Sequence, residues 1–492
     1  MHNTSALAAT LLASCASGDE GTSQPTTAAA VEGETQAEGG ADEATTEATP
    51  EHRKIELAVK DLGGREIAFA ARGEIFDNWQ NRDLVAESET GEALNDAVYK
   101  RNSAVEDKYN VKIVGYKLDN PMGAVQKSVK AADGQYDIFN GVLTDTMTLV
   151  QEGSVIDLTN QAGLNVRNPW WDQKAVDGLA INGKLYTLMG DAIVGDDRAT
   201  QITLFNKKIL KDYNLDDPYA SVKAGKWTID QFYSLAKAAT KDLDGDGVLG
   251  EMDQWGYVTE YNLVYGTVAS SGEKMVTIGA NGDMEITINT PRIVTVFDKV
   301  FEVMTDPNTT QFAEKYLGKY SNPWLEVNVK SFQEDRALFY SCSFNAVPYF
   351  REMDTDFGIL PIPKYNEEQE NYYSSVQYGN LTPISILKTD KNMEDLMMVL
   401  ESMGQESVDT VTVAYYDINL RTKIARDEDS KEMIDIIFDN RVFDMGPLFR
   451  WANGTEFFAE IVKSGNNTYV SKAESVIGKI ETAMAKSLEK LQ

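Results

Sequence analysis

One stretch, residues 203–253, constrains the fold more than any other part of the chain. It opens with a short apolar run of strand length, residues 203–205, and Lys207–Tyr213 is then expected to form one or two helical turns. Thr228 and Gln231 have the three-residue spacing of a capping box, which marks the start of a helix. Four apolar residues follow at the spacing of one helix face, namely Phe232, Leu235, Ala236 and Ala239. The stretch therefore predicts a strand and then a capped, amphipathic helix.

An acidic loop comes directly after this helix. Its residues occupy positions 1, 3, 5, 7, 9 and 12 of an EF-hand-like calcium loop; in order they are Asp242, Asp244, Asp246, Val248, Gly250 and Asp253. Gly247 stands at the sharp turn, and the last position holds Asp instead of Glu, which shortens its reach. We predict a calcium ion with a structural role. The alternative is an exposed acidic loop without a metal.

Length, charge and histidine content exclude several classes of protein. A chain of 492 residues is too long for one compact core, so two or more lobes are expected. The formal net charge of -31 disfavours nucleic acid and anionic membrane surfaces as partners. His2 and His52 both lie outside the part expected to fold, which excludes Ser–His triads and His-rich zinc sites from it. No motif indicates an organic cofactor.

The N-terminus is similar to a bacterial lipoprotein leader. Leu7–Leu12 is apolar but too short to span a bilayer, and it runs into Leu-Ala-Ser-Cys, where Cys15 would take the lipid. Residues 1–5 contain no Lys or Arg, unlike most secretory leaders, and a chance match is the alternative. The following segment is rich in Ser, Thr, Ala, Gly and Glu and cannot bury a core. We predict a signal peptide over 1–15 and a disordered tether over 16–53, and no transmembrane helix after them.

The region after the tether alternates strand and helix patterns. Strands are expected over Glu66–Ala71, Val111–Gly115 and Tyr136–Val142, and helices over Ala93–Tyr109, Gln126–Ala132 and Thr146–Val150. This alternation indicates an α/β fold with a largely parallel sheet. Ligands of such sheets bind at the carboxyl ends of the strands. Two loops, residues 72–83 and 141–145, are therefore expected to lie near a binding site.

Four residues of these two loops are candidate ligand contacts. Glu74 and Trp79 lie in the first loop, where the tryptophan could stack on a sugar ring or fold back onto the protein surface. Thr144 and Asp145 lie in the second, where they could bond ligand hydroxyls or cap the next helix. For Trp79, Thr144 and Asp145 the sequence leaves both alternatives open.

Several segments together resemble one known family. The first contains Phe205, Asn206, Lys207, Pro218, Trp227, Thr228, Asp230 and Phe232. Further similarities are Lys108–Ile113, Glu152–Leu158, the Trp171–Leu188 stretch, and the sequence FGILPIP at 357–363. Taken together, these segments resemble the extracellular solute-binding proteins of ATP-driven (ABC) importers, in the group named family 1 that binds sugars and oligosaccharides. The resemblance covers everything after the tether.

The resemblance implies a type II periplasmic-binding-protein-like fold, in which two α/β lobes are joined by a hinge and enclose a cleft. It implies an N-terminal lobe of 54–200 plus 380–412 and a C-terminal lobe of 201–379 plus 413–492. By position in the family, further ligand contacts are expected at Asp197, Glu260, Tyr261, Tyr265, Phe344, Asn345, Tyr378 and Trp451.

The function implied is capture of a carbohydrate, expected to be an oligosaccharide, by lobe closure and its delivery to an ABC permease. The protein is then expected to be a non-enzymatic monomer, lipid-anchored at the extracellular face of the bacterial cell membrane. Two alternatives remain: a secreted hydrolase that acts on glycans with two carboxylates, and a surface receptor for a peptide or another solute.

Overall fold

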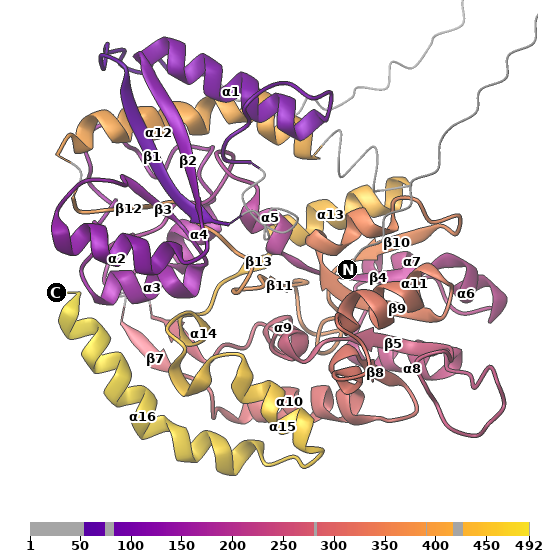
Figure 1. Ribbon diagram of the computed structural model, residues 1–492. Helices are drawn as coiled ribbons and strands as arrows, with labels where there is room; N and C mark the ends of the chain where they lie inside the picture. Colours follow the sequence, from indigo (N-terminus) through magenta and orange to yellow (C-terminus); the bar gives the residue numbers. More distant parts are fainter. Residues whose placement is uncertain (1–53, 74–82, 280–282, 390, 417–426, 492) are drawn as a thin grey trace, which may run out of the picture. The chain divides into compact units, whose positions relative to one another are not determined.

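The computed structural model describes residues 54–73, 83–279, 283–389, 391–416 and 427–491. All of them belong to one compact unit that spans His52–Gln492. Within this unit the strands form two main sheets and two short ribbons (Figure 1).

The first sheet has the strand order β12-β3-β1-β2. Its strands are β1 (Arg65–Arg72), β2 (Val111–Leu118), β3 (Ile138–Asn140) and β12 (Ser385–Ile386). β1 is parallel to both β2 and β3, as the sequence predicted, and the late strand β12 is antiparallel to β3. Residues 67–71 of β1 are fully buried, because helices cover both faces of a parallel sheet.

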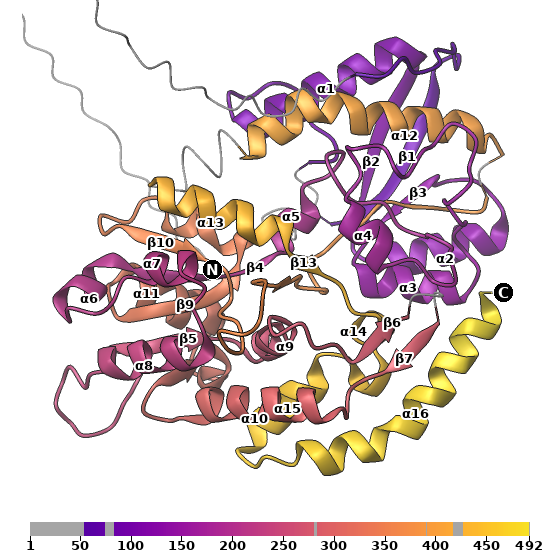
Figure 2. The same cartoon turned by 180° about the vertical axis from the view of Figure 1, so that it is seen from behind.

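Four helices belong to this sheet: α1 (Ala93–Tyr109), α2 (Pro121–Ala131), α3 (Leu143–Gln151) and α12 (Met393–Ser407). α1 and α12 lie side by side, although they are far apart in the sequence (Figures 1 and 2). α1 has the bounds that the sequence predicted. α2 and α3 begin earlier than predicted: Asn120 caps α2 by accepting the N–H of Gly123 at 2.9 Å, and Thr144 and Asp145 lie in the first turn of α3.

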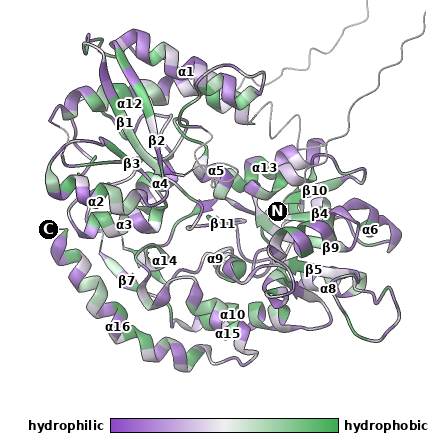
Figure 3. Ribbon diagram, in the orientation of Figure 1, coloured by the Kyte–Doolittle hydropathy of each residue, from purple (hydrophilic) through white to green (hydrophobic). Residues whose placement is uncertain are grey.

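The second sheet has the order β10-β4-β9-β5-β8 and is mixed. Its strands are β4 (Gln201–Asn206), β5 (Trp255–Thr259), β8 (Thr310–Phe312), β9 (Ala337–Ser343) and β10 (Phe357–Leu360). β4 is antiparallel to β9 and β10, whereas β5 is parallel to β8 and β9. These strands are mainly hydrophobic in Figure 3, in keeping with their burial.

The stretch singled out in the sequence forms β4, α6 (Lys207–Asp212), α7 (Pro218–Lys223) and α8 (Ile229–Ala239). Thr228 Oγ1 accepts the N–H of Gln231 at 3.3 Å, so the predicted helix cap is confirmed. The four predicted apolar residues of α8 are all buried. Trp227 is buried beneath them and its indole N–H donates to the carbonyl of Pro361 at 3.0 Å. A strand, a cap and one apolar helix face thus anchor this part of the core.

The remaining helices lie beside the second sheet or form a third group (Figures 1 and 2). α11 (Lys330–Gln333) contacts β9, and α13 (Glu428–Asp439) contacts β10. The third group consists of α9 (Val264–Ala269), α10 (Pro291–Thr305), α15 (Glu456–Ser464) and α16 (Tyr469–Lys490). Its aromatic core includes Phe297 stacked on Tyr469 with ring centroids 4.5 Å apart. None of the helices in the described ranges has the length and hydropathy needed to cross a membrane.

Short elements complete the fold and connect the sheets. They are α4 (Gln173–Gly178), α5 (Gly195–Ala199), α14 (Met445–Leu448), the ribbon β6 (Val276–Ile278) with β7 (Met284–Ile286), and the ribbon β11 (Ser374–Ser375) with β13 (Arg441–Val442). The chain leaves the first sheet through α5 into β4 and returns from β10 through β11 to β12. It passes again from α12 to α13 through residues 417–426, which lie outside the described part. The residue boundaries of the two lobes stay a prediction.

Candidate functional site

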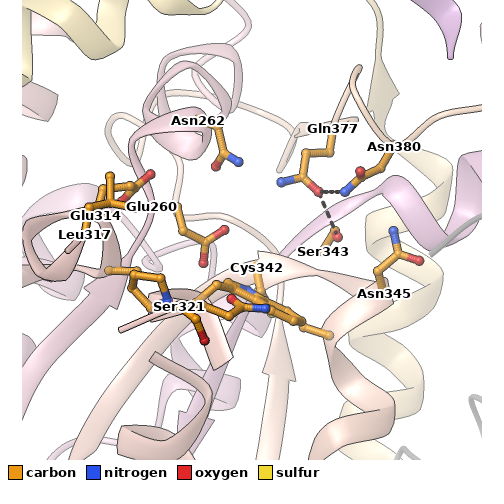
Figure 4. Close-up of a pocket in the computed structure, with 15 residues that line it drawn as sticks. Glu260, Asn262, Glu314, Leu317, Ser321, Cys342, Ser343, Asn345, Gln377 and Asn380 are labelled. Carbon is orange, nitrogen blue, oxygen red and sulfur yellow. Dashed lines mark hydrogen bonds between the residues drawn. The ribbon is translucent and has the colours of Figure 1, made fainter. Parts of the chain in front are cut away.

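A cavity of about 320 Å³ lies at the carboxyl ends of three strands of the second sheet. Glu260 follows β5, Glu314 follows β8, and Asn345 follows β9. Because β5 is parallel to both β8 and β9, these three strand ends lie at the same edge of the sheet. Carboxyl ends of parallel strands are the usual ligand position in α/β folds. We call this the strand-end cavity; Figure 4 shows the side chains that line it.

One side of the strand-end cavity is acidic. Glu260 Oε1 accepts hydrogen bonds from the Tyr340 hydroxyl at 3.1 Å and from Asn328 Nδ2 at 3.4 Å. Glu314 Oε1 accepts the backbone N–H of Tyr261 at 2.9 Å, and its Oε2 is buried with no hydrogen-bond partner. Burial, and then the nearby Glu314 charge, raise the pKa of Glu260 to about 8. Burial likewise raises the pKa of Glu314.

The opposite side of the strand-end cavity carries amides and a hydroxyl (Figure 4). Asn345 is only 5% exposed, and neither its amide oxygen nor its amide nitrogen has a hydrogen-bond partner. Gln377 Oε1 accepts from Ser343 Oγ at 3.3 Å and from Asn380 Nδ2 at 2.5 Å. A buried amide without partners is uncommon in a folded protein, because the unmade bonds cost free energy. A polar ligand in the cavity would supply the missing partners of Asn345.

Two further residues, Trp324 and Cys342, line the strand-end cavity. Trp324 is a half-buried ring that meets Tyr349 edge-on, with centroids 5.2 Å apart, and it lines the cavity as a surface for stacking. Cys342 is a free, buried thiol, and burial raises its pKa well above the usual range. The thiol is therefore protonated at neutral pH and is a poor nucleophile.

A second cavity of about 420 Å³ adjoins the first, because Asn262, Gln377 and Asn380 line both. We call it the adjoining cavity. Thr144, from the first turn of α3, and Arg450, which follows α14, also line it. Arg450 Nη2 donates to Thr144 Oγ1 at 2.9 Å and lies 3.8 Å from a carboxylate oxygen of Asp145. The two cavities together draw on α3 beside the first sheet, on the strand ends of the second, and on the chain segment that connects them.

Five of the residues predicted from the sequence line these cavities: Thr144, Glu260, Tyr265, Asn345 and Tyr378. The two tyrosines are buried walls whose hydroxyls are already engaged. Tyr265 donates to the Asp444 carboxylate, and Tyr378 accepts the backbone N–H of Asp444 at 3.1 Å. Asp145 lies next to the adjoining cavity through its contact with Arg450, and burial raises the pKa of its carboxyl group.

Three predicted aromatic contacts are not among the lining residues of either cavity: Tyr261, Phe344 and Trp451. Each stacks on another aromatic ring. The partners and centroid distances are Phe312 at 4.1 Å for Tyr261, Phe438 at 5.1 Å for Phe344, and Phe449 at 4.9 Å for Trp451. Their role as ligand contacts stays a prediction. Glu74, Trp79 and Cys15 lie outside the described residues.

Asp197 lies in a buried charge cluster and not in the lining of either cavity. Arg441 of β13 contacts three carboxylates: Asp197 at 2.5 Å, Asp172 at 2.8 Å and Asp196 at 3.3 Å. Asp172 caps α4, and Asp196 and Asp197 form the first turn of α5 just before β4. The cluster therefore ties together segments at the point where the chain passes between the sheets. Burial raises the pKa of Asp196 well above its usual value. The second cause is the neighbouring negative charge, since the cluster has one cation for three carboxylates.

Several residues that line the two cavities were not predicted as ligand contacts from the sequence: Asn262, Glu314, Trp324, Gln377, Asn380 and Arg450. Glu314 could have been found by the rule that ligands bind at strand ends, had residues 310–312 been assigned as a strand. Gln377 and Asn380 lie between β11 and β12, where the chain returns to the first sheet, and their place beside the cavity is known only from the structure. The sequence gives no comparable signal for Arg450.

Calcium binding by the acidic loop stays a prediction, and the structure shows how its carboxylates lie. Carboxylate oxygens of Asp242, Asp244 and Asp246 lie within 4.8 Å of one another. Asp253 is buried, and its two oxygens accept the N–H groups of Leu243 at 2.8 Å and Gly250 at 2.7 Å. The Gly250 carbonyl accepts the indole N–H of Trp255 at 2.8 Å. Three clustered carboxylates suit a hard cation, while Asp253 and Gly250 hold the loop closed in this conformation.

No family model matches the sequence, and no significant match to a curated protein is found. Solved structures resemble it in fold. The maltose-binding protein of Listeria monocytogenes, solved with maltose, is 15% identical; the match covers 86% of this chain and 98% of that one with a TM-score of 0.56. An ABC substrate-binding protein of the same organism, solved with cycloalternan, is 14% identical, with 86% and 99% coverage and a TM-score of 0.55. A family 1 extracellular solute-binding protein from Bifidobacterium longum subsp. infantis is 15% identical, with 85% and 100% coverage and a TM-score of 0.54.

At these identities the likeness establishes the fold. The chain has the periplasmic-binding-protein-like α/β fold, and the fold class predicted from the sequence is confirmed. The match extends over nearly the whole of each solved chain.

Proposed function

We propose that this protein is an extracellular solute-binding protein that captures a carbohydrate and delivers it to an ABC-type permease. The observation that carries the proposal is the unpaired Asn345 amide, which lies across the strand-end cavity from the carboxylates of Glu260 and Glu314. Carboxylates and amides accept and donate hydrogen bonds to hydroxyl groups, and Trp324 offers a ring for the apolar face of a sugar. The solved structures with maltose and with cycloalternan support a carbohydrate as the ligand class.

Isothermal titration calorimetry against neutral and amino-bearing oligosaccharides tests this proposal. We expect saturable binding to at least one sugar, and loss of most of that affinity when Asn345 is replaced by alanine. Binding to peptides or to other solutes, with none to any sugar, would show that the ligand class is wrong. Co-purification with membrane permease subunits in the presence of that sugar tests the delivery step.

One observation favours a second candidate function, a glycan hydrolase. Glu260 and Glu314 place two carboxylates in one cavity, which is the minimum that glycoside hydrolysis requires. In such an enzyme one carboxylate is ionised while the other is protonated. The solved structures that share this fold are binding proteins, and the protein is therefore proposed to bind without catalysis. Release of the chromophore from nitrophenyl glycosides by the wild type, and none by a Glu260→Gln variant, would favour the hydrolase instead.

We further propose that Cys15 carries a lipid and anchors the protein, as a monomer, to the outer face of the cell membrane. The support is the lipoprotein-like leader and the polar segment that follows it. Metabolic labelling with a palmitate analogue is expected to mark the wild type and to fail in a Cys15→Ala variant, which should be released from the membrane.

A further inference from the structure

We propose that the strand-end cavity takes the protonated amine of an amino sugar, and that this amine lies between Glu260 and Glu314. The inference rests on the proposed function, because it assumes a carbohydrate ligand. It goes further by assigning a charge to that ligand and a place to the charge.

The acidic side of the cavity has carboxylates without a cation. Among the described residues that line it there is no Lys or Arg. The partners of Glu260 are the neutral groups of Tyr340 and Asn328, and Glu314 Oε2 has none. Glu260 is buried and Glu314 is half-buried. Two such carboxylates in one cavity are costly to ionise together unless a positive charge lies between them.

The charged and titratable neighbours do not remove this imbalance. The groups that act on Glu260 from β5 and β9 are Tyr257, Tyr340 and Cys342, and burial holds all three in the neutral form. From α15, Lys463 and Glu456 act on Glu314 with opposite signs. Lys463 lies 3.7 Å from a Glu456 oxygen and does not line the strand-end cavity. Lys463, the cation whose charge acts on Glu314, is therefore shared with another carboxylate.

A neutral sugar and an amino sugar have different consequences for these carboxylates. A neutral sugar displaces water from Glu260 without supplying charge, so the carboxyl group stays protonated and acts as a weak acceptor. An ammonium group favours the ionised form of both carboxylates and makes charge-assisted hydrogen bonds to them. Binding of the amine therefore drives a proton off Glu260, whereas a neutral sugar leaves it in place.

The remaining walls fix the orientation of such a ligand. Asn345, Ser343, Gln377 and Asn380 lie opposite the two glutamates in Figure 4, where they can bond hydroxyl groups. Arg450 and Glu456 both line the adjoining cavity, so its lining carries one charge of each sign and offers a cation no pair of carboxylates. The amine is thus directed into the strand-end cavity and the uncharged part of the ligand into the adjoining one.

The experiment is calorimetry on the full chain with a matched pair of ligands. A trisaccharide that carries a single glucosamine unit and its N-acetylated form share one skeleton and differ by one charge. Maltotriose serves as a neutral sugar of another skeleton, and spermidine as a cation without a sugar. We expect the free amine to bind at least about tenfold more tightly than the N-acetylated form. At pH 6, where both the amine and Glu260 are mainly protonated, titration in buffers of different ionisation enthalpy should show release of about one proton.

Variants show whether the two glutamates cause the preference. Glu314→Gln keeps an acceptor for the Tyr261 N–H and should reduce the ratio of the two affinities to near one; Glu260→Gln should do the same and abolish proton release. Glu428→Gln, at an exposed glutamate on α13, is the matched control and should change neither. Thermal unfolding of each variant separates misfolding from loss of the amine preference.

Each outcome decides between the inference and the proposed function. Equal binding of the matched pair, or a preference for the N-acetylated form or for maltotriose, overturns the amine assignment and leaves carbohydrate capture intact. Binding of spermidine without any sugar, or binding of no sugar in the wider panel, overturns the proposed function as well. A preserved amine preference in both glutamine variants would place the amine elsewhere.

Discussion

Asn345 and Asn328 are two buried asparagines whose hydrogen-bond partners differ. Asn328 Nδ2 donates to the carbonyl of Thr259 at 2.7 Å and to Glu260 at 3.4 Å, so it joins β5 to the segment that follows β8. Asn345 makes no hydrogen bond through either side-chain atom. The first side chain contributes to the folded state, and the second is available to a ligand.

The two alanine variants should therefore change different quantities: Asn345→Ala the affinity for sugar, and Asn328→Ala the free energy of unfolding. Asn345→Ala is expected to weaken sugar binding by about tenfold, since one or two ligand hydrogen bonds are lost, with little change in the free energy of unfolding. Asn328→Ala is expected to lower the free energy of unfolding by about 1–3 kcal/mol, because it leaves a buried carbonyl unpaired. Calorimetry and urea unfolding of both variants measure this. A large loss of stability in Asn345→Ala would contradict its assignment to the ligand.

Asp191 is a second residue whose surroundings have a measurable consequence. Burial, and then the nearby Asp197 and Asp172 charges, raise its pKa to about 7, although a 2.7 Å hydrogen bond from Thr412 and the charge of Arg441 act in the other direction. The folded protein then binds a proton at Asp191 that the unfolded chain has already released above about pH 4.

Stability contributed by Asp191 is accordingly present below about pH 4 and is lost as the pH rises toward 7. In an Asp191→Asn variant this loss is absent. Between pH 4.5 and 7 the free energy of unfolding of the variant should rise relative to the wild type by up to about 1.4 kcal/mol per pH unit. Urea unfolding at four pH values gives the two curves. Parallel curves would mean that Asp191 is already ionised in this range.

At the scale of single elements, the acidic loop between α8 and β5 shows how spacing and structure relate. The spacing of aspartates predicted a shared ligand position for Asp242, Asp244 and Asp246, and the structure brings their oxygens within 4.8 Å. Asp253 was predicted as a further ligand, but in the structure its two oxygens accept backbone N–H groups of the loop. The clustering of the three aspartates follows from their spacing along the chain, whereas the position of Asp253 depends on the packing of β5.

We predict that this loop binds calcium and that the ion raises the melting temperature of the protein. Terbium is a suitable probe, because Trp255 donates a hydrogen bond to the loop and can sensitise terbium emission. Asp244→Asn should reduce terbium and calcium affinity by at least about tenfold, since one anionic ligand is lost. Asp212→Asn, at an exposed aspartate paired with Lys208, is the control. Emission and melting temperature that do not respond to either ion would favour the exposed loop without a metal.

At the scale of the whole molecule, the two sheets are linked by several passes of the chain, and residues of those passes line both cavities. A ligand that touches α3, the strand ends of the second sheet and the connecting segment gains most binding free energy when these parts lie close together.

Saturation with a bound sugar should therefore make the molecule more compact. Small-angle X-ray scattering is expected to show a lower radius of gyration with sugar than without. Asn345→Ala at the same sugar concentration is the control, and it should remain partly in the larger form because fewer molecules have ligand bound. An unchanged radius in the wild type at saturation would indicate that binding does not need closure.

The sequence predicted those parts of the fold that depend on neighbours along the chain. The bounds of α1 and the cap and apolar face of α8 follow from residue spacing, because the helix period is a local property. The parallel pairing around β1 follows from the alternation of strands and helices along the chain. The starts of α2 and α3 were not predicted. Asn120 followed by Pro121 is a strong start signal for α2, whereas Val142 offers no side-chain cap for α3.

The candidate site was only partly predictable, for a physical reason. Glu260 and Asn345 were predicted as ligand contacts because they follow recognisable segments. Their role in ligand binding depends on Glu314, Gln377 and Asn380, which are remote in sequence. Pairing of β5, β8 and β9 at one edge brings these groups together, and burial then changes their protonation and leaves an amide unpaired. The order of amino acids alone determined the kind of fold; the charge of the cavity and the groups left free for a ligand were decided by tertiary packing, because desolvation acts only where distant segments exclude water.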